Sequence, residues 1–115
     1  LRCFMFKPSL WEEKLVREYE ERELKRKRVL EELIPKLKDY FKDKEVDKVF
    51  IFGSILGEGL FYDFSDVDIA CEGLKENYFR VFSELEDLVG RNIDLVELEY
   101  CRFREDILKR GIRIK

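Results

Sequence analysis

A four-residue run that is apolar on both faces, Val49–Phe52, ends abruptly at Gly53. Short continuous apolar runs between polar connectors are typical of a buried central strand. A second run with strand character begins in the sequence Ser65-Asp66-Val67-Asp68 and continues to Cys71. Alternation along a strand places the valine and the cysteine on one face and the two aspartates on the other. We therefore expect two neighbouring buried strands joined by the glycine-containing segment 53–65.

A long helical segment is predicted before the first strand. Ser9 and Glu12 form a capping box, and apolar residues then recur at helical spacing as far as Phe41, so a helix is expected to begin near Leu10. Pro35 lies inside this segment and should kink it or split it in two, because proline removes a backbone donor.

The C-terminal half alternates helical and strand patterns. The predicted elements are a helix over 76–89 closed by Gly90, a strand over 93–98, a helix over 100–110 that buries Phe103 and Ile107, and an edge strand over 112–114. This alternation within 115 residues predicts one compact α/β or α+β domain, with helices packed against a small mixed sheet.

The middle of the N-terminal helical segment is highly charged. Residues 20–28 offer only Leu24 to a core, and four acid–base pairs have the favourable i,i+4 spacing: Glu13/Arg17, Glu18/Arg22, Glu21/Lys25 and Glu23/Lys27. We interpret the charged run as a solvated helix face, preceded by an apolar stripe from Trp11 to Tyr19 that suits a protein partner. The predicted division is an N-terminal helical extension, residues 1–29, and a compact domain, residues 30–115.

Composition limits the class of protein. The net charge of −3 gives no reason to expect direct nucleic-acid binding. Three cysteines (Cys3, Cys71 and Cys101) without a CxxC spacing support neither a disulfide framework nor a zinc site, and predict reduced thiols in a cytoplasmic protein. No apolar run is long enough for a membrane span, and no signal peptide is predicted. The abundance of Lys, Glu and Arg favours a thermophilic source.

Carboxylates are placed where they should repel one another. Asp66 and Asp68 share a strand face with α-carbons about 6.6 Å apart. In a partly buried cleft, two unit charges at this distance cost on the order of 3 kcal/mol. A divalent cation removes that cost, and Mg²⁺ is commonly held by one or two carboxylates together with substrate phosphates. Asp94 is a lone carboxylate in the next predicted strand and would complete a set of three if it faced the pair.

The Gly53-Ser54 turn could supply a phosphate cradle. Glycine lets a backbone approach a phosphate closely, and the following N–H groups and hydroxyl can bind its oxygens. Carboxylates, metal and phosphate cradle together fit nucleotidyl transfer by in-line displacement with two metal ions. Each part alone also has a plainer reading: an ordinary turn at Gly53-Ser54, a solvated turn at Asp66 and Asp68, and a strand end capped by Asp94.

The order of these residues resembles the minimal nucleotidyltransferases of the DNA polymerase beta superfamily. That family has a hydrophobic strand ending in Gly-Ser, then about ten residues, then Asp-x-Asp entering a second strand, and a third carboxylate on a later strand. The resemblance covers roughly residues 30–115, including the Leu-Lys-Arg-Gly-Ile sequence near the C-terminus. It implies the nucleotidyltransferase fold.

The resemblance also implies roles for individual residues. Asp66 and Asp68 would bind two Mg²⁺ ions, and Asp94 would ligate the catalytic ion and help to activate an acceptor hydroxyl. Gly53 and Ser54 would hold the triphosphate of ATP, and we add Ser65 to these expected nucleotide-binding residues. One departure is that Ile55 and Leu56 follow the Gly-Ser pair, where many members carry Arg or Lys. Phosphate charge must then be met by metal, backbone or a more distant base.

Single-domain members of this family often accompany a small helical HEPN ribonuclease as the antitoxin of a toxin–antitoxin pair, and some add AMP to a toxin tyrosine. The resemblance therefore implies a Mg²⁺-dependent protein adenylyltransferase. The alternative is a non-catalytic module of the same fold that neutralises a partner by contact. A third option is nucleotide transfer to a small molecule or RNA end, with the acceptor site built by a homo-oligomer.

Overall fold

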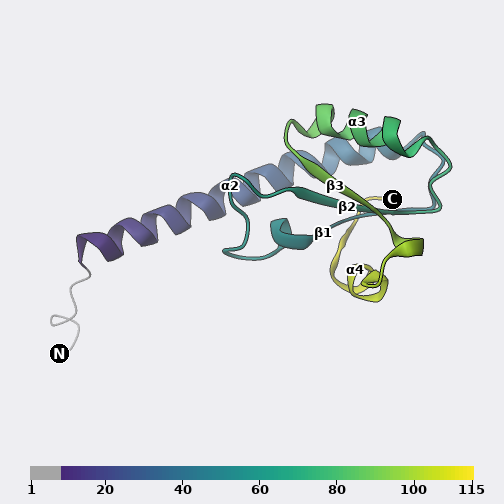
Figure 1. Cartoon of the computed structure of the whole chain (residues 1–115). Coiled ribbons are helices and arrows are strands. Elements are labelled where there is room, and N and C mark those ends of the chain that lie inside the picture. The colour runs from purple at the N-terminus through teal and green to yellow at the C-terminus, as the bar shows by residue number, and fades with distance from the viewer. Residues whose placement is uncertain (1–8) are drawn as a thin grey trace.

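The computed structural model describes residues 9–115 and consists of a small sheet, a long helix along one side of it, and two shorter helices (Figure 1). The long helix, α2, runs from Leu10 to Phe41. Its C-terminal half lies against the sheet, whereas its N-terminal half projects past the domain. The N-cap is Ser9, whose Oγ accepts a hydrogen bond from the backbone N–H of Glu12 at 3.1 Å. The predicted helix start is therefore confirmed.

The sheet is mixed and has the strand order β3-β2-β1-β4. Its strands are β1 (Lys48–Phe52), β2 (Val67–Glu72), β3 (Ile93–Glu97) and β4 (Ile112–Arg113). Strand β1 is antiparallel to both β2 and β4, and β2 is parallel to β3. The remaining elements are α3 (Tyr78–Val89), α4 (Arg104–Arg110) and two short 3-10 helices, Gly53–Leu56 and Leu98–Tyr100. The predicted α+β fold, with a long N-terminal helix and a small mixed sheet, is confirmed.

Both faces of the central strands are covered, as the apolar run of β1 predicts. On one face, Val49 and Ile51 belong to the main core, together with side chains from α2 and α3 such as Leu37 and Leu85. On the other face, Phe50 forms a smaller cluster with Ala70, Leu98 and Ile107, the last of which belongs to α4. The two layers fix β1 and β2 rigidly, so residues at the strand ends have defined positions.

Pro35 does not split α2, which is continuous from Leu10 to Phe41. A proline inside a helix costs about 3 kcal/mol. Leu33, Leu37 and Phe41 flank it and are almost completely buried. Each such side chain contributes about 1.5–3 kcal/mol on burial, so packing exceeds the cost of the proline. The predicted boundary between residues 29 and 30 falls inside this helix and stays a prediction.

The reading of the charged segment was wrong in its details. Leu24 is 62% exposed, and the buried residue of the segment is Glu23, at 9%. None of the four expected i,i+4 pairs forms within residues 9–115; Glu23 pairs instead with Arg26, three residues on. Segment 20–28 is therefore not simply a solvated face. The stripe before it does stay exposed, with Trp11 at 64% and Leu15 at 45%.

Two expectations for the C-terminal helix also differ from the structure. The helix α4 begins at Arg104 rather than at Tyr100, because residues 98–100 form a separate 3-10 turn. Ile107 is buried as expected, but Phe103 precedes the helix and is 69% exposed. The short strand β4 confirms the predicted edge strand and pairs with β1.

Two of the three cysteines lie in the described part of the chain. Cys71 is buried, Cys101 is partly buried, and both are free thiols; Cys3 lies outside the described residues. Between residues 9 and 115, no helix has the length and apolar character needed to cross a membrane.

Candidate active site

The candidate site begins where β1 ends. Gly53 has a φ of +83°, and a β-carbon at this position would overlap the carboxylate of Asp68. Only glycine meets both the constraint on φ and the constraint on space. Other residues rarely adopt this φ, and all of them have a β-carbon. The chain then forms the 3-10 turn Gly53–Leu56, anchored by the fully buried Ile55. The backbone of Gly53 therefore lies directly beside the second aspartate of the Asp-x-Asp sequence.

The sheet register brings the carboxylates together. Asp68 of β2 pairs with Phe52 of β1 on one side and with Asp94 of β3 on the other. Neighbours in register point to the same face of a sheet, so Asp68 and Asp94 project side by side. Asp66 stands immediately before β2, two residues from Asp68. The register thus places Asp94 beside Asp68, which is half-buried, while Asp66 and Asp94 are exposed.

Electrostatics at Asp68 are unfavourable for the free carboxylate. Burial, and then the charges of Asp94 and Asp66, raise the pKa of Asp68 from 3.8 to about 6. Within the described chain, none of these three carboxylates has an ion-pair or hydrogen-bond partner among the side chains and backbone. The site therefore holds concentrated negative charge that the protein does not itself neutralise.

The chemistry of these donors fits Mg²⁺ completed by a substrate. No group of three acidic side chains in residues 9–115 is close enough to form a complete metal site alone. Mg²⁺ does not need one, because it is usually held by one or two carboxylates, water and substrate phosphates. Asp68 and Asp94, with Asp66 beside them, suit that arrangement. Their roles as metal ligands stay predictions.

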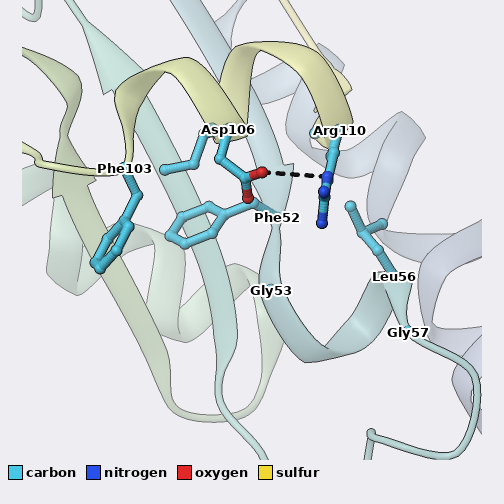
Figure 2. Close-up of a pocket in the computed structure, with 9 residues that line it drawn as sticks. Phe52, Gly53, Leu56, Gly57, Phe103, Asp106 and Arg110 are labelled. Carbon is cyan, nitrogen blue, oxygen red and sulfur yellow. Dashed lines mark ion pairs between the residues drawn. The ribbon is translucent and has the colours of Figure 1, made fainter.

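A pocket of about 450 Å³ opens beside Gly53 (Figure 2). One wall is the end of β1 and the following turn, and the other is α4; the lining residues are Phe52, Gly53, Leu56, Gly57, Phe103, Asp106, Ile107, Arg110 and Gly111. Its volume lies in the range of small-ligand sites. Figure 2 shows Arg110 and Asp106 projecting from α4, joined by an ion pair with Nε and Oδ1 3.1 Å apart.

Arg110 is a candidate site residue that the sequence alone did not reveal. Among the described residues that line the pocket, Arg110 is the basic one. It lies across the pocket from the Gly53–Leu56 turn. It lies far from that turn in sequence. Only the pairing of β4 with β1, directly after α4, brings the end of this helix to the turn.

Ser65 has a local structural contact. Its Oγ accepts a hydrogen bond from the backbone N–H of Tyr62 at 2.9 Å, and its carbonyl accepts from Arg91. Arg91 also donates to the carbonyls of Tyr62 and Asp63, so it shapes the segment that leads into Asp66. The sequence did not single out Arg91. Nucleotide binding by Ser65 stays a prediction.

Comparison with known proteins identifies the class. Residues 35–115 match the family model described as Polymerase beta, Nucleotidyltransferase, so the chain belongs to this family. The resemblance inferred from Gly53, Ser54 and the aspartates is confirmed at this level. No curated protein sequence gives a significant match.

Two solved structures share the fold. One is a crystal structure of a toxin–antitoxin with AMP-PNP, with a TM-score of 0.57 and 19% identity, covering 71% of this chain and 72% of that one. The other is a crystal structure of the toxin–antitoxin MntA-HpeT bearing two aspartate-to-glutamate substitutions, with a TM-score of 0.55, 15% identity and 71% coverage of both chains. At these identities the likeness shows the nucleotidyltransferase fold.

Proposed function

We propose that this chain is a Mg²⁺-dependent nucleotidyltransferase that transfers AMP from ATP to a hydroxyl of a partner protein. The observation that carries the proposal is the contact of the Gly53 backbone with Asp68, which has Asp94 in register beside it. A phosphate held at the Gly53-Ser54 turn would lie next to carboxylates that lack protein counter-charges. Membership of the nucleotidyltransferase family supports the same reaction class.

In the proposed reaction, the acceptor hydroxyl oxygen attacks the α-phosphorus of ATP. A new P–O bond forms, the bond between the α-phosphorus and the bridging oxygen breaks, and pyrophosphate leaves. Bound Mg²⁺ would neutralise the carboxylates and polarise the phosphates. Asp94 is exposed on the edge strand β3, and we assign it the role of accepting the proton of the acceptor hydroxyl. Gly53 and Ser54 orient the triphosphate, and Asp66 and Asp68 hold the metal side of the site.

Arg110 supplies the positive charge that the Gly53–Leu56 turn lacks. Ile55 and Leu56 follow the Gly-Ser pair, and the segment from there to Asp66 carries Glu58 and Asp63 but no basic residue. We assign Arg110 to the phosphates, because its guanidinium lines the pocket that Gly53 shares. A guanidinium binds phosphate through two parallel hydrogen bonds. In the structure, this guanidinium forms an exposed ion pair with Asp106.

The proposed acceptor is a small helical protein of the HEPN type, with this chain as its antitoxin. The fold likeness to chains of toxin–antitoxin crystal structures, one of them with AMP-PNP, supports this assignment. The projecting end of α2 offers an apolar surface for such a partner, since Leu10, Trp11 and Val16 are all more than half exposed.

The test uses the full chain and the protein encoded by the neighbouring reading frame. Incubation with Mg²⁺ and ATP labelled at the α-phosphate should transfer label to that protein. Asp68→Asn should abolish transfer, whereas Asp87→Asn, on the exposed face of α3, should leave it unchanged. Equal labelling by both variants would refute the assigned mechanism.

The second candidate is a non-catalytic module that neutralises its partner by covering it. The hydrophobic residues after Ser54 favour it, because a turn without a neighbouring base is a weaker phosphate site. Calorimetry separates the two functions. Magnesium-dependent ATP binding that is lost in the Asp66→Asn/Asp68→Asn double variant would exclude a pure scaffold.

A further inference from the structure

The charged middle of α2 carries a buried ion pair. The side chains of Glu23 and Arg26 are each only 11% exposed, although both belong to a run of charged residues. The Arg26 Nη2 lies 2.9 Å from Glu23 Oε1, and its Nε lies 3.2 Å from both carboxylate oxygens. Charges are rarely buried without a specific partner, so this pair needs an explanation beyond helix solubility.

The remaining polar atoms of the pair bind the segment that joins the two halves of the candidate site. We call residues 53–65 the site loop; it begins with the Gly53-Ser54 turn and leads to Asp66. Arg26 Nη1 donates to the carbonyl of Ile55 at 3.0 Å, and the backbone N–H of Gly59 donates to Glu23 Oε2 at 2.9 Å. The hydrogen bond from Arg26, and next the one from Gly59, lower the pKa of Glu23 and so favour its charged form.

Neighbouring residues of the helix extend these contacts along the site loop. Tyr19 donates its hydroxyl to Glu58 Oε1 at 2.7 Å. Lys25 pairs with Asp63 at 2.6 Å, and the Arg22 guanidinium lies 4.7 Å from the ring centroid of Tyr62. The helix thus contacts the loop at its beginning, in its middle and close to Asp66.

The contacting residues lie on the face of α2 that continues into the hydrophobic core. Tyr19, Glu23, Arg26, Leu30, Leu33, Leu37 and Phe41 follow one another at intervals of three or four residues, and all of them are buried or partly buried. This spacing defines a single helix face. The C-terminal half of this face packs on the sheet through apolar side chains. In the N-terminal half, the charged pair Glu23–Arg26 occupies the same face and binds backbone groups of the site loop.

We propose that Glu23 and Arg26 are positioning residues, which hold the site loop in the arrangement that receives the nucleotide. The inference rests on the proposed function. Both residues precede residue 35, where the match to the family model begins, so this chain supplies the support from outside the matched region. Gly53, Gly57 and Gly59 give the loop large conformational freedom. Fixing it in advance removes that entropy from the cost of binding.

The experiment compares substitutions in the full-length chain. Arg26→Met removes the charge and the hydrogen bonds but keeps the aliphatic stem, and Arg26→Lys keeps the charge without the planar fork. The matched control is Lys42→Met, which removes an exposed ion pair with Asp39 at the C-terminal end of the same helix. Amide hydrogen exchange reports on the loop, and calorimetry with ATP and Mg²⁺ reports on binding.

We expect Arg26→Met to raise amide exchange within residues 55–65 by about tenfold or more, with peptides from β2 unchanged. ATP affinity should fall by about tenfold or more, and Arg26→Lys should restore part of it. The control should match the natural chain in both measurements. Unchanged loop exchange, or unchanged ATP affinity in Arg26→Met, would overturn the inference.

Two further outcomes separate this inference from the proposed function. If the natural chain does not bind ATP, the proposed function fails, and loop exchange still decides whether the pair holds the loop. If Arg26→Met does not fold by circular dichroism, Tyr19→Phe replaces it, because this variant removes only the hydroxyl bound to Glu58. A smaller rise in loop exchange is then expected around Gly59, and no rise would contradict the inference.

Discussion

Gly53 and Asp68 are in such close contact across β1 and β2 that a β-carbon on the first would overlap a carboxylate oxygen of the second. The antiparallel register produces this contact, because Phe52 pairs with Asp68 and Gly53 is the next residue along the chain. The positive φ of Gly53 then turns the backbone away from the strand direction. Glycine is thus required at this position both for its conformation and for the space it leaves beside the carboxylate.

Gly53→Ala is therefore expected to lower stability and to abolish ATP binding. Gly90→Ala is the matched control, since Gly90 has nearly the same φ, +75°, but nothing within 4 Å of the added carbon. The control should lose about 1–2 kcal/mol of unfolding free energy from backbone strain alone. Gly53→Ala should lose more, because the added carbon also displaces Asp68.

Urea denaturation gives the stability of both variants, and calorimetry gives their ATP affinity. Equal losses of stability in the two variants, together with retained ATP binding in Gly53→Ala, would show that the contact with Asp68 has no consequence for the site.

The pKa of Asp68 gives a second prediction, made for the metal-free protein in the presence of a chelator. Burial, Asp94 and Asp66 raise this pKa from 3.8 to about 6. Since the folded state holds the proton more tightly than the unfolded chain, this group stabilises the fold at low pH. The contribution is lost as pH rises from about 4 to about 6, and amounts to roughly 1 kcal/mol once solvent screening is allowed for.

Carbon-13 NMR of the aspartate carboxyls measures this titration directly. Asp94→Asn should lower the pKa of Asp68, because it removes the larger of the two charge contributions. A midpoint of Asp68 near 4 in the natural chain, or one that Asp94→Asn leaves in place, would contradict the electrostatic description of the site.

Leucines at two positions of α2 provide a third prediction. Leu37 is fully buried beneath the sheet, and Leu24 is 62% exposed. Leu37→Ala should cost about 2–5 kcal/mol of unfolding free energy through lost burial and an internal cavity. Leu24→Ala should stay within about 0.5 kcal/mol of the natural chain. Thermal or urea unfolding of the two variants decides the matter; similar costs would mean that α2 packs with a different face.

The sequence predicted the parts of the fold and site that depend on local pattern. Apolar runs located β1 and β2, Gly90 closed α3, and the strand period predicted a common face for Asp66 and Asp68. The position of Asp94 beside Asp68 follows only from the parallel register of β2 and β3. Hydrophobic periodicity could not find Glu23, because a charged residue occupies a position that the pattern reserves for an apolar one. Continuing the three- and four-residue spacing back from Leu30 would have reached it.

Contacts between segments that are distant in sequence were out of reach for a physical reason. The position of Arg110 depends on how α4 returns the chain to the edge of β1, and that of Arg91 on three backbone carbonyls of a loop. Neither residue has a local signature, since an arginine near a helix end is common. Such residues become visible only once the sheet order is known.

Arg110 carries the last prediction, because it tests how the site manages phosphate charge without a base after Ser54. Arg110→Met should weaken ATP affinity by about tenfold or more while stability changes little, since charge-assisted bonds to phosphate exceed a surface ion pair in strength. Arg80→Met is the control, as it removes another i,i+4 ion pair, between the exposed Arg80 of α3 and Glu76 just before that helix. The affinities of the natural chain and Arg110→Met should differ less for AMP than for ATP, because AMP lacks the β- and γ-phosphates. If Arg110→Met binds ATP as the natural chain does, the assignment of Arg110 to the phosphates is wrong.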